Sequence, residues 1–294
     1  MRDIAEPGAC KLMVEVEEDA MGSRMLATQI RWLGPLATLC GLACGYAAVG
    51  VLGQEGMTVL TVIFFAGTNW IPSEVDSLTT LCFICFALGG VMGFGGEALH
   101  GHPQLPLFFV LVALFHLTEF SFCALFHEKE IEFRGFMLTP VPAAGYSIAI
   151  IAAILEFWLW HAVGMLRTFQ FAFVLLGGVL AFGGWGLRTA ALFTAQSNFT
   201  HIVACHKESS HRLVTQGVYS LCRHPGYVGW FLWSVSTQVL LGNIFCFFAY
   251  AFVSWRFFAG RIPHEEQMLI RFFGDEYLDY ASRVPCGIPW ISEV

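Results

Sequence analysis

The sequence predicts an all-α polytopic membrane protein with about eight transmembrane helices and a cytosolic cap. Of its 294 residues, 56% are hydrophobic and only 13% are Asp, Glu, Lys or Arg. The apolar residues gather in runs near the ~20 residues that one membrane crossing needs. This composition is not that of a soluble domain. With a net charge of −7 and no basic run, nucleic acid is not an expected partner.

Eight hydrophobic segments account for these runs. With eight spans both chain ends share one compartment, and of the 15 Lys and Arg residues only Arg167 falls on the opposite side. Because cytosolic loops keep an excess of Lys and Arg, we expect both termini and the 196–225 loop to be cytosolic. Two of the segments, 57–71 and 226–241, are short, and 57–71 could instead be re-entrant, which would weaken this charge asymmetry. The segments are approximately 30–53, 57–71, 78–96, 105–126, 143–165, 169–195, 226–241 and 244–260.

Three regions follow from this arrangement. Residues 1–29 contain an acidic run and no short apolar stretch of the kind that marks a cleavable signal peptide. We expect them to form a flexible cytosolic tail. Residues 30–165 form the N-terminal transmembrane helices. Residues 166–294 hold the remaining helices together with the polar loop and the C-terminal tail.

Small residues within the spans indicate close helix packing. Gly41-x-x-x-Gly45 and Gly89-x-x-x-Gly93 are patterns that let two helices approach closely. The glycine-rich segment 169–195 is thin enough to admit a neighbouring helix or a ligand, and we expect packing. Most of the ten Cys residues lie in apolar runs, where cysteine is a small hydrophobic residue.

The C-terminal tail is expected to contain two short helices. Pro263 is suited to the first turn of an amphipathic helix, and Glu265 and Glu266 lie in that turn, where the helix dipole favours negative charge. Gly274 is typical of a helix C-cap. A second helix follows from Asp275 to Arg283.

The most unusual stretch is the polar junction 215–230, which leads into an apolar run. Its Arg223-His224-Pro225 sequence combines a fixed cation, an imidazole and a proline suited to begin a helix. A helix start offers free N–H groups and a positive dipole end. The junction is therefore either an anion-binding loop or an ordinary membrane-entry loop with interfacial aromatic residues.

Other charged residues lie near or within the apolar segments. Arg188, Arg256 and Arg261 stand near cytosolic ends, where they either face a cavity or extend to the membrane surface. Arg261 is five residues from Glu266, and the two are expected to meet if the turn at Pro263 folds back. A carboxylate-held arginine would position a substrate carboxylate. Within the spans, His116, Glu119, Glu156 and His161 suggest hydrogen bonds between helices, with a lipid tunnel as the alternative.

A metal site is not expected. His201, His206 and His211 recur every five residues, and Cys205 lies beside the second of them. Five residues do not return a helix to one face, and this spacing matches no common zinc pattern.

Several motifs between about 185 and 290 carry a family resemblance. Their order and spacing resemble the isoprenylcysteine carboxyl methyltransferase family, the protein-S-isoprenylcysteine O-methyltransferases; the first 140 residues resemble it only in hydrophobic profile. The motifs are Leu213-Val214-Thr215-x-Gly217-Val218-Tyr219, Arg223-His224-Pro225-x-Tyr227-Val228-Gly229-Trp230, Glu265-Glu266, Phe273-Gly274-Asp275-Glu276-Tyr277-Leu278-x-Tyr280 and Arg283-Val284-Pro285-x-Gly287-x-Pro289.

The resemblance implies S-adenosylmethionine-dependent methyl esterification of the α-carboxylate of a C-terminal prenylated cysteine. The substrates would be CaaX-processed proteins such as small GTPases, met at the endoplasmic reticulum membrane, with S-adenosylhomocysteine as product and no metal. Residues 166–294 would be the catalytic core. By resemblance Arg188, Arg261 and Glu266 place the substrate carboxylate, with Arg256 as a fourth. The cofactor side would be Gln196, His211, Leu213, Val214, Tyr219, His224, Pro225, Tyr227 and Glu265.

Two other enzyme classes resemble parts of this region. NADPH-dependent membrane sterol reductases share an Arg-His-x-x-Tyr-x-Gly element, but theirs has Asn before the Tyr and Asp after the Gly, where this chain has Gly226 and Trp230. Phospholipid N-methyltransferases use the same cofactor but methylate an amine, which has no need of an arginine. A scaffold or transporter is the non-enzymatic alternative, although no inverted repeat supports it.

Overall fold

The described part of the chain is helical throughout its regular elements. The computed structural model describes residues 7–68, 71, 75, 77–97, 103–127, 131–138, 145–164, 170–201, 203, 206–207 and 211–291. All elements assigned there are α- or 3-10 helices, which confirms the predicted all-α class. Arg167 and Cys205, which entered the predictions above, lie outside these residues. The chain divides into two compact units, Met1–Phe94 with His116–Ala144, and Gly95–Phe115 with Gly145–Val294.

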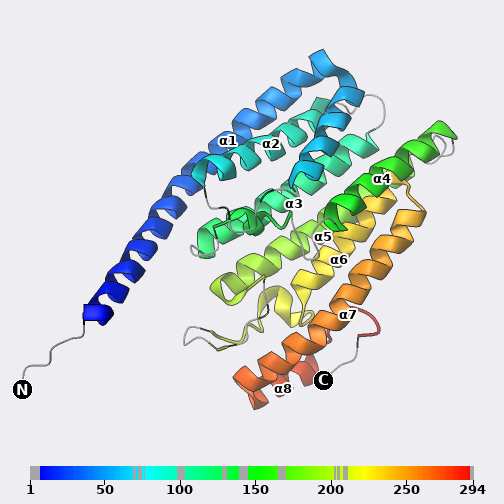
Figure 1. The fold of residues 1–294 in the computed structure, drawn as a ribbon. Helices are drawn as coiled ribbons and strands as arrows, with labels where there is room; N and C mark the ends of the chain where they lie inside the picture. The colour runs from blue at the N-terminus through cyan, green and yellow to red at the C-terminus, as the bar shows by residue number, and fades with distance from the viewer. Residues whose placement is uncertain are drawn as a thin grey trace, which may run out of the picture. The chain divides into compact units, whose positions relative to one another are not determined.

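In the first unit, α1 (Pro7–Gly67) and α2 (Leu78–Glu97) pack backbone against backbone (Figure 1). A Cβ atom on Gly41 would lie 1.9 Å from the carbonyl oxygen of Phe86, and one on Gly93 would lie 2.0 Å from that of Leu42. These distances leave no room for a side chain, so only glycine permits the approach. The two Gly-x-x-x-Gly patterns therefore pack helices together, as the sequence predicted.

The helix α1 covers more of the chain than the sequence suggested. It includes the expected span 30–53, most of the expected span 57–71, and residues 7–29 of the expected flexible tail. Figure 1 shows its ribbon changing direction at the upper end, so the assigned helix runs in two directions. Pro7 stands at the first position, where a missing N–H has no cost.

The second unit contains the helices that build the site. The helix α3 (Gln104–Phe126) is divided between the units: its residues up to Phe115 belong to the second unit, and those from His116 onward belong to the first. The second unit continues with α4 (Gly145–Ala162), α5 (Gln170–Ala195), α6 (Pro225–Leu241), α7 (Phe245–Phe273) and α8 (Asp275–Arg283). Short 3-10 turns lie at Gln196–Asn198 and Gly217–Ser220.

The pair α5 and α6 is held together by glycine. A Cβ atom on Gly177 would lie 2.2 Å from the backbone nitrogen of Leu240, and one on Gly184 would lie 2.4 Å from that of Trp233. A Cβ atom on Gly229 of α6 would likewise lie 2.5 Å from the backbone nitrogen of Arg188 on α5. Figure 1 shows the two helices side by side. These glycines therefore serve helix packing, the first of the two roles considered from the sequence.

A buried glutamate fixes the start of α7. Glu156 on α4 accepts hydrogen bonds from the backbone N–H groups of Ile244, Phe245 and Cys246, each at 2.7 Å. The first N–H groups of a helix have no partner within the helix, and a carboxylate satisfies both them and the dipole. Glu156 is therefore the hydrogen-bonded link between helices that the sequence suggested.

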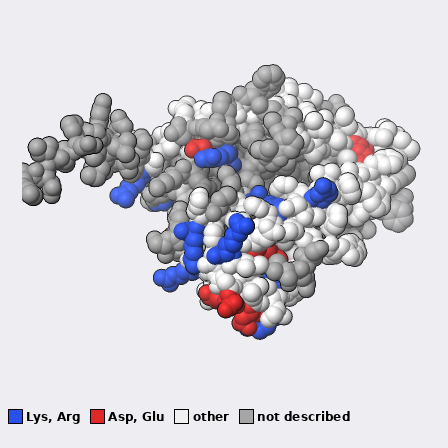
Figure 2. Space-filling model, turned by 60° about the horizontal axis from the view of Figure 1, so that its bottom comes forward, with Lys and Arg blue, Asp and Glu red and all other residues white. Residues whose placement is uncertain are grey.

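The surface of the described residues has the character of a membrane protein. Three helical segments are long and apolar enough to cross a bilayer, namely Gln104–Phe126, Gly145–Ala162 and Gln170–Asn198. Large apolar side chains such as Phe248 and Phe252 on α7 are 66% and 65% exposed. Figure 2 shows broad uncharged surfaces, with Lys, Arg, Asp and Glu gathered in limited areas.

The prediction that Pro263 begins a separate helix is wrong, because α7 runs through Pro263 without interruption. Proline removes one intrahelical hydrogen bond, but tertiary packing outweighs local preference: Ile262 and Glu266, on either side of it, are both fully buried. The helix ends at Gly274, whose N–H donates to the carbonyl of Ile270. The predicted C-cap and the following helix α8 are confirmed.

Glycine packing in α5 yields a direct test of the fold. We expect Gly184→Ala to lower the free energy of unfolding by about 1–3 kcal/mol, the usual cost of overpacking a close contact. Gly183→Ala, on the same helix with nothing within 4 Å of the added carbon, should be neutral or stabilising, since alanine favours helix. The thermal unfolding midpoints of both variants in detergent measure this. Equal midpoints would contradict the packing.

Candidate functional site

The start of α6 is built as the sequence predicted. His224 is the N-cap and Pro225 occupies the first helical position. The backbone N–H groups of Arg223 and His224 donate to the carbonyls of Pro285 and Cys286, at 2.9 and 3.3 Å. The polar junction is thereby joined to the C-terminal tail.

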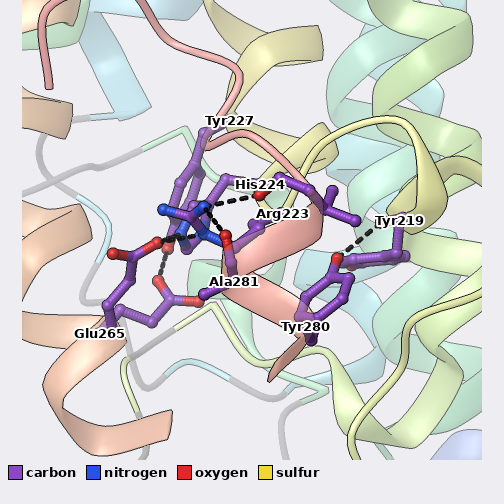
Figure 3. A network of polar contacts seen from close by, with 9 residues as sticks. Tyr219, Arg223, His224, Tyr227, Glu265, Tyr280 and Ala281 are labelled. Carbon is purple, nitrogen blue, oxygen red and sulfur yellow. Dashed lines mark hydrogen bonds and ion pairs between the residues drawn. The ribbon is translucent and has the colours of Figure 1, made fainter. Parts of the chain in front are cut away.

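A buried ion pair ties this junction to α7. Arg223 donates through Nε to Glu266 Oε1 at 2.7 Å, and His224 Nε2 lies 3.1 Å from the same oxygen. The side chains of Arg223, His224 and Glu266 are 1%, 3% and 0% exposed. Arg223 Nη1 also donates to the carbonyls of Ala281 and Val284, at 3.2 and 2.6 Å (Figure 3). One guanidinium thus holds α6, α7 and the end of α8 together.

The electrostatics of Glu266 follow from these contacts. Burial by itself would raise the pKa of the Glu266 carboxyl. The hydrogen bonds from His224 and Arg223 outweigh burial and place that pKa below its usual range. The carboxylate is therefore charged at neutral pH. Its contribution to stability is fully present above the pKa of the unfolded state and is lost as the pH falls from there through the lowered pKa.

A second polar network lies beside the first. The Tyr227 hydroxyl donates to Glu265 Oε2 and accepts a hydrogen bond from Arg261 Nε at 2.8 Å. Arg261 Nη2 donates to the carbonyl of His201 at 2.5 Å, and its guanidinium lies 5.7 Å from the centre of the Tyr227 ring. Arg261 is therefore held in a fixed orientation.

The predicted contact between Arg261 and Glu266 is wrong. Because α7 is continuous through Pro263, Arg261 and Glu265 are four residues apart and share a helix face, whereas Glu266 lies a further 100° around the axis. Glu266 instead pairs with Arg223, a residue that the sequence did not single out as part of the site. The unusual polar junction indicated that Arg223 could matter. Nothing in the sequence indicated that its partner would be Glu266, which is 43 residues away.

The other two predicted arginines occupy different surroundings. Arg188 is buried, donates from Nη1 to the carbonyl of Gly226 at 3.3 Å, and lies over the Phe199 ring at 4.8 Å. Arg256 is exposed on α7. Of the three predicted arginines, Arg188 and Arg261 contact the start of α6.

A cavity of about 130 Å³ opens between the 211–214 segment, the start of α6 and the end of α7. Of the residues predicted for the cofactor side, only Gln196 does not line it; Gln196 is exposed, with a positive φ of 50°. The predicted residues on the wall are His211, Leu213, Val214, Tyr219, His224, Pro225, Tyr227 and Glu265. Wall residues that the sequence reasoning missed include Asn198, Phe199, Arg212, Arg223, Met268, Leu269, Phe272, Phe273, Tyr277 and Tyr280.

Hydrogen bonds fix the walls of this cavity. Asn198 Oδ1 accepts a hydrogen bond from the backbone N–H of Arg212 at 2.8 Å, which holds the 211–214 segment. Tyr280 donates to the carbonyl of Tyr219 at 2.6 Å (Figure 3). Burial raises the pKa of Tyr280 to about 12, so this hydroxyl remains a donor at any physiological pH. In the described ranges, no three His, Cys, Asp or Glu side chains are grouped to hold a metal ion.

These features define a class. The chain is a membrane protein whose described elements are all helical, with a polar cavity at the start of α6 and the held arginines Arg188 and Arg261 beside it.

Comparisons with known proteins identify the family. Residues 176–271, from α5 to α7, match the Isoprenylcysteine carboxyl methyltransferase (ICMT) family. The protein-S-isoprenylcysteine O-methyltransferases of Rattus norvegicus and Mus musculus are 37% and 38% identical over 253 residues, covering 82% of this chain and 86% of each relative. The solved structure of the eukaryotic intramembrane Ras methyltransferase ICMT is 31% identical with a TM-score of 0.73, covering 89% of this chain and 97% of that one. The chain belongs to the isoprenylcysteine carboxyl methyltransferase family.

The buried ion pair makes a prediction about pH. Glu266→Gln keeps the shape but leaves Arg223 as an unpaired buried cation, so we expect a loss of about 3–5 kcal/mol in the free energy of unfolding at pH 7. The wild-type advantage should be fully present above about pH 4.5 and should shrink as the pH falls through the lowered Glu266 pKa. The difference between the unfolding midpoints of the wild type and Glu266→Gln, measured from pH 3 to 7, tests this pH dependence.

The matched control is Asp279→Asn, which removes the exposed ion pair between Asp279 and Arg283. It should change the midpoint little, because exposed pairs contribute little. A Glu266→Gln midpoint equal to that of the wild type at neutral pH would contradict the account of the buried pair.

Proposed function

We propose that this chain transfers the methyl group of S-adenosylmethionine to the α-carboxylate of a C-terminal prenylated cysteine. The observation that carries the proposal is the cavity at the start of α6. The Arg261 guanidinium donates a hydrogen bond to the hydroxyl of Tyr227, a residue of the cavity wall. Family membership supports the same reaction. The substrates would be CaaX-processed proteins, among them small GTPases.

The cavity suits S-adenosylmethionine in its chemistry. Aromatic side chains, including Phe199, Phe272 and Phe273, offer apolar surface to an adenine ring, and Glu265 offers a carboxylate to a cationic group. Among the described residues, the buried Arg223 Nη2 on the cavity wall has no hydrogen-bond partner. It is a suitable donor for the carboxylate of the amino-acid end.

The reaction needs alignment more than it needs a base. The substrate carboxylate is already ionised at neutral pH. When bound, S-adenosylmethionine supplies a sulfonium methyl group: a C–O bond forms, the C–S bond breaks, and the electron pair stays on sulfur. Arg261 and Arg188 would orient the carboxylate, while the surrounding aromatic residues exclude water. Arg256, exposed on α7, would meet the substrate only outside the cavity.

The membrane arrangement is part of the proposal. We place about eight spans in the endoplasmic reticulum membrane, with both termini cytosolic and the 196–225 loop and C-terminal tail forming a cytosolic cap. The peptide part of the substrate would arrive from the cytosol and the prenyl chain from the lipid. The coarse membrane character is supported by the apolar helices and their exposed side chains.

The function is tested by incubating the purified full chain with labelled S-adenosylmethionine and N-acetyl-farnesylcysteine. The expected product is a base-labile methyl ester. A preparation that binds the cofactor but forms no ester would overturn the assignment. Binding of NADPH without affinity for S-adenosylmethionine would favour the reductase instead.

Substitutions at the two networks give a further prediction. Arg261→Ala and Glu266→Ala should each lower turnover at least about a hundredfold, because the positioning of one reactant is lost. Arg271→Ala, which removes an exposed cation from the last turn of the same helix, is the control and should keep near-normal turnover. Turnover is measured as the initial rate of ester formation at saturating cofactor. A normal rate in Arg261→Ala would show that Arg261 does not position the substrate.

A further inference from the structure

The hydroxyl group of Tyr227 stands between two opposite charges. Its oxygen accepts a hydrogen bond from the Arg261 cation and its single proton is donated to the Glu265 carboxylate. Figure 3 shows Tyr227 and Glu265 pointing toward one another. Arg261 and Glu265 are four residues apart on α7, yet the contact between them runs through this hydroxyl.

Each charged neighbour has a group that can take a ligand: Glu265 lines the cavity, whereas Arg261 does not line it but keeps one donor nitrogen. Arg261 uses Nε on Tyr227 and Nη2 on His201, which leaves Nη1 without a protein partner among the described residues. On the proposed function, on which this inference rests, the substrate carboxylate binds at Arg261 and a cationic group of the cofactor binds at Glu265.

We infer that Tyr227 is a positioning residue that couples the binding of the two substrates. Hydrogen bonds in a chain polarise one another. A carboxylate on Arg261 reduces the pull of the guanidinium on the Tyr227 oxygen, so Tyr227 becomes a weaker donor to Glu265. The Glu265 carboxylate then holds the cationic cofactor more strongly.

The same reasoning applies in the other direction. A cation on Glu265 weakens the hydrogen bond from Tyr227, makes the hydroxyl oxygen a poorer acceptor, and releases Arg261 for the substrate. Thermodynamic linkage requires both directions to have the same magnitude. The coupling is therefore positive, and each reactant raises the affinity for the other.

The test measures the dissociation constant of S-adenosylhomocysteine on the purified full chain, with and without saturating N-acetyl-farnesylcysteine. We expect the farnesyl compound to tighten binding at least about fivefold in the wild type, the lower end of measured couplings. In Tyr227→Phe the ratio should fall below about twofold while each ligand alone still binds. A purely structural loss would weaken single-ligand binding and leave the ratio unchanged.

The control is Ser282→Ala, which removes an exposed hydroxyl on α8 that donates to a backbone carbonyl and does not line the cavity. It should keep the wild-type ratio. A wild type with a ratio of one, or a Tyr227→Phe variant with the wild-type ratio, overturns the inference. Ester formation without coupling leaves the proposed function standing, and coupling without ester formation leaves the inference standing.

Discussion

The buried carboxylate of Glu266 is the interaction on which the site depends. A fully buried charge is tolerated only when it is paired and hydrogen-bonded, and Arg223 and His224 provide both partners. Arg223 in turn satisfies two carbonyls near the end of α8. The start of α6, the end of α7 and the C-terminal tail are therefore parts of one electrostatic unit, although they are far apart in the sequence.

The continuity of α7 gives this unit its chemistry. Because the helix continues through Pro263, Glu265 and Glu266 point in different directions, one toward Tyr227 and the other toward Arg223. Two neighbouring carboxylates consequently have separate tasks. Glu266 links α7 to the start of α6 through Arg223 and His224. Glu265 lines the cavity and accepts a hydrogen bond from the Tyr227 hydroxyl, which also contacts Arg261. A helix broken at Pro263 would not impose this geometry.

The sequence predicted the parts of the molecule that depend on local chemistry. The all-helical class, the helix start at Pro225, the glycine contacts and the end of α7 at Gly274 follow from propensity, patterning and the special conformations of Gly and Pro. The family resemblance supplied eight residues of the cavity wall, and more of the wall was missed than predicted. Features that depend on distant partners were not available: the path of α7 through Pro263 is decided by packing, and the pair of Arg223 with Glu266 spans 43 residues. Arg256 and Arg261 are close in the sequence but lie on different faces of α7, so Arg256 is exposed whereas Arg261 contacts Tyr227.

The central claim is that the cavity framed by the Glu266 ion pair is the cofactor site. An experimental structure of the full chain with S-adenosylhomocysteine tests it most directly. The account predicts the ligand between the 211–214 segment and Glu265, in contact with the start of α6, with the Arg223–Glu266 pair intact. A ligand bound elsewhere in the helical bundle, or an Arg223 that has left Glu266, would contradict it.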